Sequence, residues 1–196
     1  TDWSWGVLFA DLDNDANKDL LITNGIRKDV NDNDVIKINE FSLNPMKVDT
    51  KELRSQPLSN YVFQNTGGFK FKNITRSAGF NSKGFSNGVA YGDLDNDGDL
   101  DIIISNLDGI ASVYENKTEN SNHYLRIKIK GPKENPNGLG TRITVFNGDK
   151  MQMQELTLTR GFQSSVEPIV HFGLGQNKLV ERLMISWPDG SKQVLN

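Results

Sequence analysis

Cysteine is absent from the 196 residues, and histidine occurs only twice, as His123 and His171. The absence of cysteine excludes a disulfide scaffold, a cysteine-ligated zinc site, an iron–sulfur cluster and a thiol nucleophile. Two imidazoles are too few for a multi-histidine metal centre. No apolar run approaches the roughly 20 residues that a membrane-spanning helix needs. The first residues lack a basic region followed by an apolar stretch, so we expect no signal peptide within this sequence.

Acidic side chains are abundant but unevenly placed. The formal net charge is −3, yet residues 117–196 carry 11 basic and 7 acidic side chains, for +4, and residues 1–116 carry 11 and 18, for −7. The acidic excess is concentrated in residues 11–19 and 93–101, which together hold nine aspartates and one lysine. Because like charges at this density repel unless they are neutralised, the clusters predict bound cations. Two divalent ions would change the net charge from −3 to +1.

An internal repeat organises the first half of the chain. Residues 5–15 align with residues 87–97 at a constant offset of 82, and the match continues through residues 19–22 and 101–104. Such self-similarity is typical of repeat architectures, in which a four-stranded unit needs about 40–50 residues. The longer spacing predicts an insertion in the first copy, over the polar residues 27–57, with a short capped helix near residues 49–53. Alternating or continuously apolar segments at residues 61–63, 69–72, 102–104 and 113–114 predict strands, and therefore β-blades.

Each acidic cluster has the form Asp-x-Asp-x-Asp-x-x-x-Asp. Alternate residues of a tight loop direct their oxygens at a common centre, and a backbone carbonyl at the seventh position joins them. Six to eight hard oxygen ligands favour Ca²⁺ over the stricter octahedron of Mg²⁺. The sequence therefore predicts two Ca²⁺ sites, with the ligands Asp11, Asp13, Asp15, Asn17, Asp19, Asp93, Asp95, Asp97, Asp99 and Asp101. Gly98 permits the sharp turn of the second loop, whereas Ala16 at the equivalent position predicts a more strained or weaker first loop.

The loops differ from an EF-hand, which needs a glutamate at position 12, where this sequence has Ile22 and Ile104. Their strand–loop–strand context instead resembles the FG-GAP or VCBS repeat of integrin-like β-propellers, most closely over residues 92–101. The resemblance implies a calcium ion that clamps the turn between two strands of a blade. Its role is then structural, because no acid or base is positioned for metal-assisted catalysis.

A G-x-S-x-G motif surrounds Ser86, as in the nucleophile elbow of α/β-hydrolases. That motif requires a helix after the serine, whereas here a strand-like segment and an acidic loop follow. Ser4 occupies the equivalent position of the first copy, so the serine belongs to the repeat. We interpret Ser86 and both histidines as structural residues and expect no enzymatic activity.

The pattern changes after residue 122. Leu125, Ile127 and Ile129 alternate with Arg126, Lys128 and Lys130, which predicts a half-buried strand with a basic outer face. That face is expected either to be solvated or to pack against the acidic blades. Asn147-Gly148 predicts a tight hairpin. Met151 and Met153 are expected to face inward, followed by Leu156 and Leu158, and the resulting phase slip near Glu155 predicts a β-bulge. A last strand is expected at residues 183–187. Short strands with tight turns predict a small β-sandwich or barrel. Residues 140–143, 160–165, 171–175 and 187–190 also resemble the ASPIC/UnbV domain, which typically follows VCBS repeats.

These observations predict a mainly β chain: a partial β-propeller of about two blades with calcium loops over residues 1–116, and an ASPIC/UnbV-type β-sandwich over residues 117–196. We expect a segment of a longer protein that acts as a non-catalytic, calcium-binding adhesion module outside the cytoplasm, at the cell surface, secreted or periplasmic. Its expected partners are the remaining blades of the parent chain and a protein or glycan ligand. Two alternatives stay open: an accessory domain of a glycan-active enzyme, and nucleic-acid binding through the basic strand face.

Overall fold

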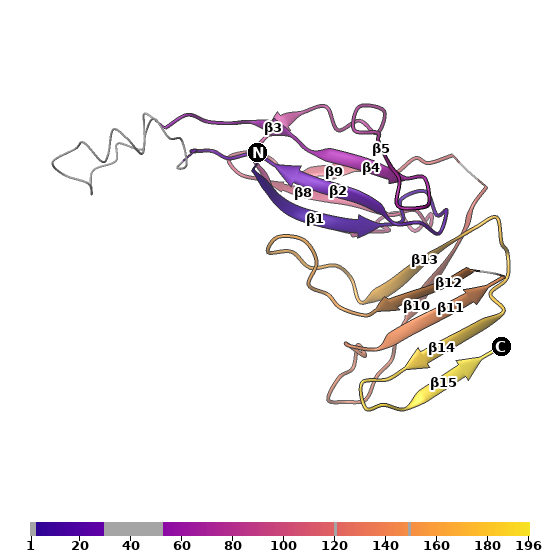
Figure 1. The fold of residues 1–196 in the computed structure, drawn as a ribbon. Coiled ribbons are helices and arrows are strands. Elements are labelled where there is room, and N and C mark those ends of the chain that lie inside the picture. The colour runs from indigo at the N-terminus through magenta and orange to yellow at the C-terminus, as the bar shows by residue number, and fades with distance from the viewer. Residues whose placement is uncertain (1–2, 30–52, 120, 149) are drawn as a thin grey trace.

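The computed structural model describes residues 3–29, 53–119, 121–148 and 150–196, and these residues form β-strands without a helix (Figure 1). The predicted mainly β fold is confirmed. Within these ranges, no segment forms a helix long and apolar enough to cross a membrane. The strands are β1 (Ser4–Ala10), β2 (Asp19–Asn24), β3 (Leu58–Ser59), β4 (Tyr61–Asn65), β5 (Phe71–Asn73), β6 (Lys83–Gly84), β7 (Ser86–Gly92), β8 (Asp101–Asn106), β9 (Ser112–Tyr114), β10 (His123–Lys128), β11 (Arg142–Asn147), β12 (Lys150–Glu155), β13 (Ile169–Gly175), β14 (Arg182–Ser186) and β15 (Lys192–Leu195).

The two copies of the sequence repeat form two stacked antiparallel sheets. Blade 1 has the strand order β1-β2-β4-β5, and blade 2 has the order β7-β8-β9. Side chains alternate between the two faces of a strand, and one face of each sheet contributes to a shared core. That core contains Leu8, Leu21 and Val62 from blade 1 and Val89, Ile102 and Ile104 from blade 2, and Phe80 is buried with them. The alternating apolar residues of the repeat therefore place one apolar face on each blade, and these two faces pack against each other.

The predicted insertion interrupts blade 1 between β2 and β4. Its two ends run antiparallel, because Ile26 and Gln56 exchange backbone hydrogen bonds and the amide of Asp29 donates to the carbonyl of Arg54 at 3.0 Å. The chain thus leaves and re-enters the blade at one place. The helix predicted near residues 49–53 falls almost entirely on residues 30–52, which lie outside the described ranges.

The second half forms two sheets around a separate core. One sheet pairs β10 with β13, and the other has the order β12-β11-β14-β15. Ile143, Val145 and Phe172 lie at the centre of the core between them, as the predicted sandwich requires. The Asn147-Gly148 hairpin is confirmed, since β11 and β12 are joined in register with Asn147 opposite Lys150. The strand predicted last is followed by β15, which pairs with β14.

The predicted β-bulge near Glu155 is wrong. The pairing of β11 with β12 has no register shift from Arg142–Glu155 to Asn147–Lys150, and Met151 and Met153 are exposed. The inward positions belong to two glutamines. Gln152 donates to the carbonyl of Gly173 at 2.7 Å, and the nearly buried Gln154 donates to that of His171. Because these inward side chains are polar and donate hydrogen bonds to the backbone of β13, the alternation of apolar and polar residues in β12 does not show which face is buried.

Candidate metal centre

The two acidic loops adopt the same backbone conformation. Asn14 and Ala16 have φ of +57° and +75°, and the equivalent Asn96 and Gly98 have φ of +64° and +95°. A left-handed conformation is strained for alanine because its Cβ approaches the following carbonyl oxygen. Ala16 therefore places strain in the first loop that glycine avoids in the second, as the sequence predicts.

The same hydrogen bonds close both loops. Asp19 accepts from the amides of Leu12 and Asn65, at 3.0 and 2.8 Å. Asp101 repeats this with Leu94 and Asn116, both at 2.8 Å. The last aspartate of each motif thus ties the start of its loop to a neighbouring segment of the same blade. Hydrogen bonds within each loop also repeat. In both loops, backbone amides donate to aspartate side chains two or five residues earlier; the donors are Asp15, Ala16, Asn17, Asp97, Gly98 and Asp99.

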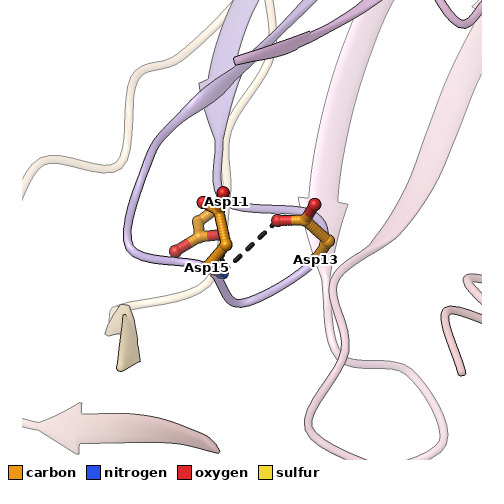
Figure 2. A group of neighbouring side chains, drawn as sticks. All are labelled: Asp11, Asp13 and Asp15. Atoms are coloured by element: carbon orange, nitrogen blue, oxygen red, sulfur yellow. Dashed lines mark hydrogen bonds between the residues drawn. The ribbon is translucent and has the colours of Figure 1, made fainter. Parts of the chain in front are cut away.

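Three carboxylates of each loop converge. One oxygen from each of Asp11, Asp13 and Asp15 lies within 4.8 Å of the others (Figure 2), and Asp93, Asp95 and Asp97 form the matching group. Three hard oxygen donors at this separation suit a divalent cation such as Ca²⁺. The structure thus brings together six of the ten predicted ligands. Asp19 and Asp101 close the loops, Asp99 accepts from Asn14, and Asn17 donates to Asp15.

The first loop concentrates negative charge in a buried place. Burial, with the charges of Asp15, Asp13 and Asp19, raises the pKa of Asp11 to about 7. Burial also raises the pKa of Asp19 to about 6 and lowers the pKa of Lys18 to about 8. Burial and neighbouring negative charges make the ionised form of these carboxylates unfavourable, and a bound cation would stabilise that form. The electrostatics therefore fit a metal ion in this loop.

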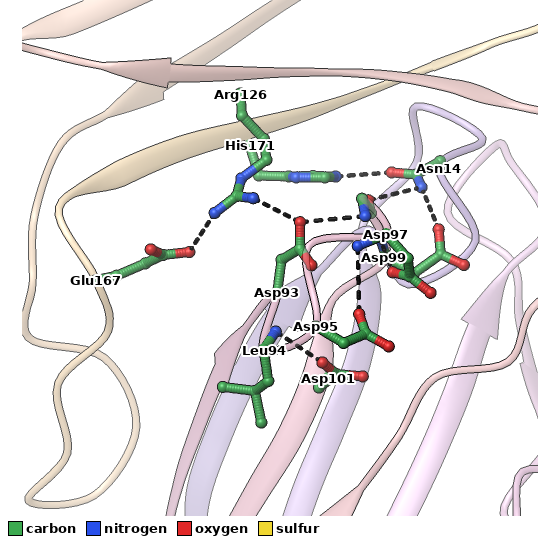
Figure 3. Close-up of polar contacts among 11 residues, drawn as sticks. Asn14, Asp93, Leu94, Asp95, Asp97, Asp99, Asp101, Arg126, Glu167 and His171 are labelled. Atoms are coloured by element: carbon green, nitrogen blue, oxygen red, sulfur yellow. Dashed lines mark hydrogen bonds and ion pairs between the residues drawn. The ribbon is translucent and has the colours of Figure 1, made fainter.

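The second loop meets a cation from the other half of the chain. Arg126, on β10, lies 2.5 Å from Oδ2 of Asp93 and 3.1 Å from Oε1 of Glu167 (Figure 3). The other carboxylate oxygen of Asp93, Oδ1, is buried and has no hydrogen-bond partner. A buried acceptor without a partner is costly, and a cation in the loop would satisfy it. This orphaned oxygen is the most direct sign that the second loop fits a metal.

Asn14 connects the two loops to each other and to the second half. Its side-chain amide donates to Oδ1 of Asp99 at 2.8 Å, and its Oδ1 lies 2.7 Å from Nε2 of His171 (Figure 3). Its backbone carbonyl accepts from the amide of Gly175 at 2.8 Å. Burial, and then the charges of Arg126 and Lys18, lower the pKa of His171 to about 4. His171 is therefore neutral near pH 7 and serves as a structural residue in this contact.

Glycines allow the sheet of β10 and β13 to lie directly on the loops. A Cβ at Gly173 would overlap Asp11 and the backbone of Asn14, and a Cβ at Gly98 would overlap the ring of Tyr124. Gly98 is thus required by packing as well as by its backbone conformation. The acidic loops form part of the interface between the two halves of the protein.

The serine of the G-x-S-x-G motif is a strand residue. Ser86 is 3% exposed, donates to Asn106 at 2.8 Å and accepts from Asn60 at 3.0 Å. Ser4 makes the equivalent bond to Asn24 at 2.7 Å. The geometry matches the interpretation of this serine as part of the repeat.

The sequence missed Asn14, and for Arg126 it left two interpretations open. Asn14 had no signal beyond its equivalence to Asn96. Arg126, Lys128 and Lys130 were expected either to form a solvated strand face or to pack against the acidic blades. The guanidinium of Arg126 packs against the acidic loop, whereas Lys128 and Lys130 are exposed. The charge difference between the halves was the signal that pointed to such a pair.

Two family models match parts of the chain. Residues 53–104 match the FG-GAP-like repeat, which includes the second loop, and residues 131–196 match the ASPIC and UnbV family. The chain thus combines one segment that is similar to the FG-GAP-like repeat with another that is similar to the ASPIC and UnbV family. It is 31% identical over 111 residues to cartilage acidic protein 1 of Xenopus tropicalis. It is also 27% and 26% identical over 112 residues to cartilage acidic protein 1 of Mus musculus and Homo sapiens. Each alignment covers 55% of this chain and 17% of the relative, so the chain spans only a small part of these proteins' length.

Proposed function

We propose that the protein is a non-catalytic, extracellular adhesion-type module in which each acidic loop binds one structural Ca²⁺. The observation that carries the proposal is the convergence of three carboxylates in each of two loops with the same backbone conformation. The buried, unpartnered Oδ1 of Asp93 supports it, as does the match of the second loop to the FG-GAP-like repeat. Asp11, Asp13 and Asp15 would hold one ion, and Asp93, Asp95 and Asp97 the other.

When bound, Ca²⁺ supplies positive charge that neutralises the clustered carboxylates. The protein's own residues then position the site: Asp19 and Asp101 close the loops, and Arg126 neutralises the side of Asp93 that faces β10. Extracellular calcium modules have dissociation constants of about 10⁻⁴ to 10⁻³ M. Outside the cytoplasm, free Ca²⁺ is high enough to fill sites of this weak affinity, so an extracellular location suits these loops. The ligand of the module is a protein or a glycan, and further blades of a longer chain complete its surface.

Calcium titration calorimetry and thermal melting test the proposal. We expect two bound Ca²⁺ per chain and a rise in melting temperature from EDTA to millimolar Ca²⁺ that millimolar Mg²⁺ does not match. Asp13→Asn and Asp95→Asn each remove one of the two bound ions. Glu134→Gln, which makes the same chemical change at an exposed position outside the loops, leaves both. No calcium-dependent shift, together with no metal in elemental analysis, would overturn the proposal.

A further inference from the structure

Basic and acidic side chains are separated along the first half of the chain. Residues 53–92 carry 5 basic side chains and no acidic one, and the rest of residues 1–116 carries 6 basic and 18 acidic side chains. The basic residues of this acid-free segment are all exposed, and four of them lie on or beside β5 and β6: Lys70, Lys72, Arg76 and Lys83. We name these four residues the basic edge. A positive surface is therefore present in a half whose net charge is −7.

The basic edge follows the margin of blade 1 that lies farthest from the second half of the protein (Figure 1). β5 is the last strand in the order β1-β2-β4-β5, and Lys72 lies on it opposite Gln64 of β4. Lys70 lies just before β5, Arg76 lies in the turn after it, and Lys83 lies on β6. Blades 1 and 2 pack on each other through their faces, so this margin is not part of the contact between blades.

A groove lies beside two residues of the basic edge. It has a volume of about 710 Å³ and is lined by residues of β3, β4, β5 and β6 and of the turn between β5 and β6. Arg76 and Lys83 line this groove, and no aspartate or glutamate does. Its other polar lining includes hydroxyl and amide side chains: Ser59, Asn73, Ser77 and Asn81. A ligand in the groove therefore meets positive charge together with hydrogen-bond donors and acceptors.

None of the four cations of the basic edge forms an ion pair with a described residue. The ion pairs among the described residues use other basic side chains: Arg27, Lys117, Arg126 and Arg142. Exposed cations of this kind attract a polyanion, and binding gains free energy because the polyanion releases its condensed counterions. The charge of the basic edge is therefore complementary to an acidic polymer.

The lining of the groove favours an acidic glycan over a nucleic acid. Proteins that bind single-stranded nucleic acid stack successive bases on exposed aromatic side chains. The aromatic residues that line this groove are Phe80, which is 6% exposed, and Tyr61, which is half-buried and lies 6.0 Å from the ring of Phe63. Hydroxyl and amide side chains instead suit the many hydroxyl groups of a sugar chain.

We propose that the basic edge binds an acidic glycan, a polysaccharide that carries sulfate or carboxylate groups. Arg76 and Lys83 bind acidic groups of the glycan in the groove, and Lys70 and Lys72 bind further groups along β5. The choice of a glycan rests on the proposed extracellular adhesion function and narrows the ligand of that function to one chemical class. Binding does not require Ca²⁺, because none of the predicted metal ligands lines the groove.

Titration calorimetry of the whole chain with a heparin oligosaccharide, a heavily sulfated probe, tests the proposal. We expect saturable binding in EDTA and in millimolar Ca²⁺, with an association constant that falls as the salt concentration rises. The double variants Lys70→Gln/Lys72→Gln and Arg76→Gln/Lys83→Gln should each raise the dissociation constant about tenfold or more and weaken its salt dependence. A dextran oligosaccharide of the same length, which is neutral, should not bind.

The matched control is Lys128→Gln/Lys130→Gln, which removes the same number of positive charges at exposed positions of the second half. This variant should bind the heparin oligosaccharide as the wild type does. Circular dichroism melts verify that each variant is folded.

A wild-type chain that does not bind the heparin oligosaccharide would overturn the proposal, and so would equal weakening by the control variant. Tighter binding of a single-stranded oligonucleotide of the same charge would also overturn it, because the basic edge would then be a nucleic-acid site. Calcium-dependent melting is measured on the same samples. A chain that binds Ca²⁺ but not the oligosaccharide would remove this inference and leave the calcium sites in place.

Discussion

The guanidinium of Arg126 lies 2.5 Å from Oδ2 of Asp93, and this ion pair joins the second half of the protein to the first aspartate of the second acidic loop. The Asp93 side chain is 0% exposed and that of Arg126 is 22% exposed. The pair therefore has little of the solvent screening that makes surface ion pairs weak. The second partner of Arg126, Glu167, lies on the segment before β13, so one arginine links β10, the acidic loop and that segment.

Replacing Arg126 by methionine should destabilise the metal-free protein by about 2–4 kcal/mol, because it leaves the buried Asp93 carboxylate without a counter-charge. Millimolar Ca²⁺ should reduce the loss, since the ion neutralises the same carboxylate. Urea denaturation in EDTA and in Ca²⁺ measures both effects. Arg142→Met is the control: its pair with Glu155 is exposed, and the expected loss is below about 1 kcal/mol. Equal losses for the two variants would contradict this prediction.

Ala16→Gly should stabilise the metal-free protein by about 0.5–1 kcal/mol, because relief of the left-handed strain exceeds the added entropy of an unfolded glycine. The reverse change in the second loop, Gly98→Ala, should be strongly destabilising, since the new Cβ is both strained and in conflict with the ring of Tyr124. Denaturant midpoints of both variants in EDTA provide the measurement. A loss of stability in Ala16→Gly would show that the alanine conformation carries no strain.

Without metal, stability should fall as pH rises from about 4 to about 7. The folded protein binds protons on Asp11 with a pKa of about 7 and on Asp19 with a pKa of about 6, whereas an unfolded aspartate has a pKa of 3.8. The folded state therefore holds more protons in this range and loses that advantage as pH rises. His171, whose pKa is lowered from 6.5 to about 4, acts in the opposite direction but is one group against two.

Urea midpoints in EDTA at about pH 5 and about pH 7.5 measure this dependence. The midpoint should be higher at the lower pH, and Asp11→Asn should flatten the difference because it removes the larger of the two shifts. A midpoint that rises with pH to the same extent in both proteins would refute the assignment.

Ser86→Ala should cost about 1–2 kcal/mol, because Nδ2 of the buried Asn60 loses the hydroxyl to which it donates and Oδ1 of Asn106 loses the hydroxyl from which it accepts. Ser4→Ala, at the equivalent and more exposed position, should cost less. Thermal melts compare the two. A Ser86→Ala chain of unchanged stability that had lost a hydrolytic activity present in the wild type would reverse the structural interpretation of this serine.

The repeat and its loops were predictable because they are specified locally. The offset of 82 residues aligns the strands, the alternating apolar residues set their faces, and the loops close through hydrogen bonds to aspartates mostly two to seven residues away. The alternation of apolar and polar residues gave a wrong prediction for β12, where Gln152 and Gln154 face inward. A glutamine is expected to face solvent unless the backbone carbonyls that accept its hydrogen bonds are known.

The sequence by itself determined the β fold, the two acidic loops and their backbone strain at Ala16, since these depend on neighbours within a few residues. Only the tertiary structure decided that the second half covers the loops. The bond from His171 to Asn14 joins residues 157 apart, and the one from Arg126 to Asp93 joins residues 33 apart. Such partners are selected by how two separate cores pack, through close approaches at Gly98 and Gly173. The period and spacing of residues along the chain carry no record of that packing.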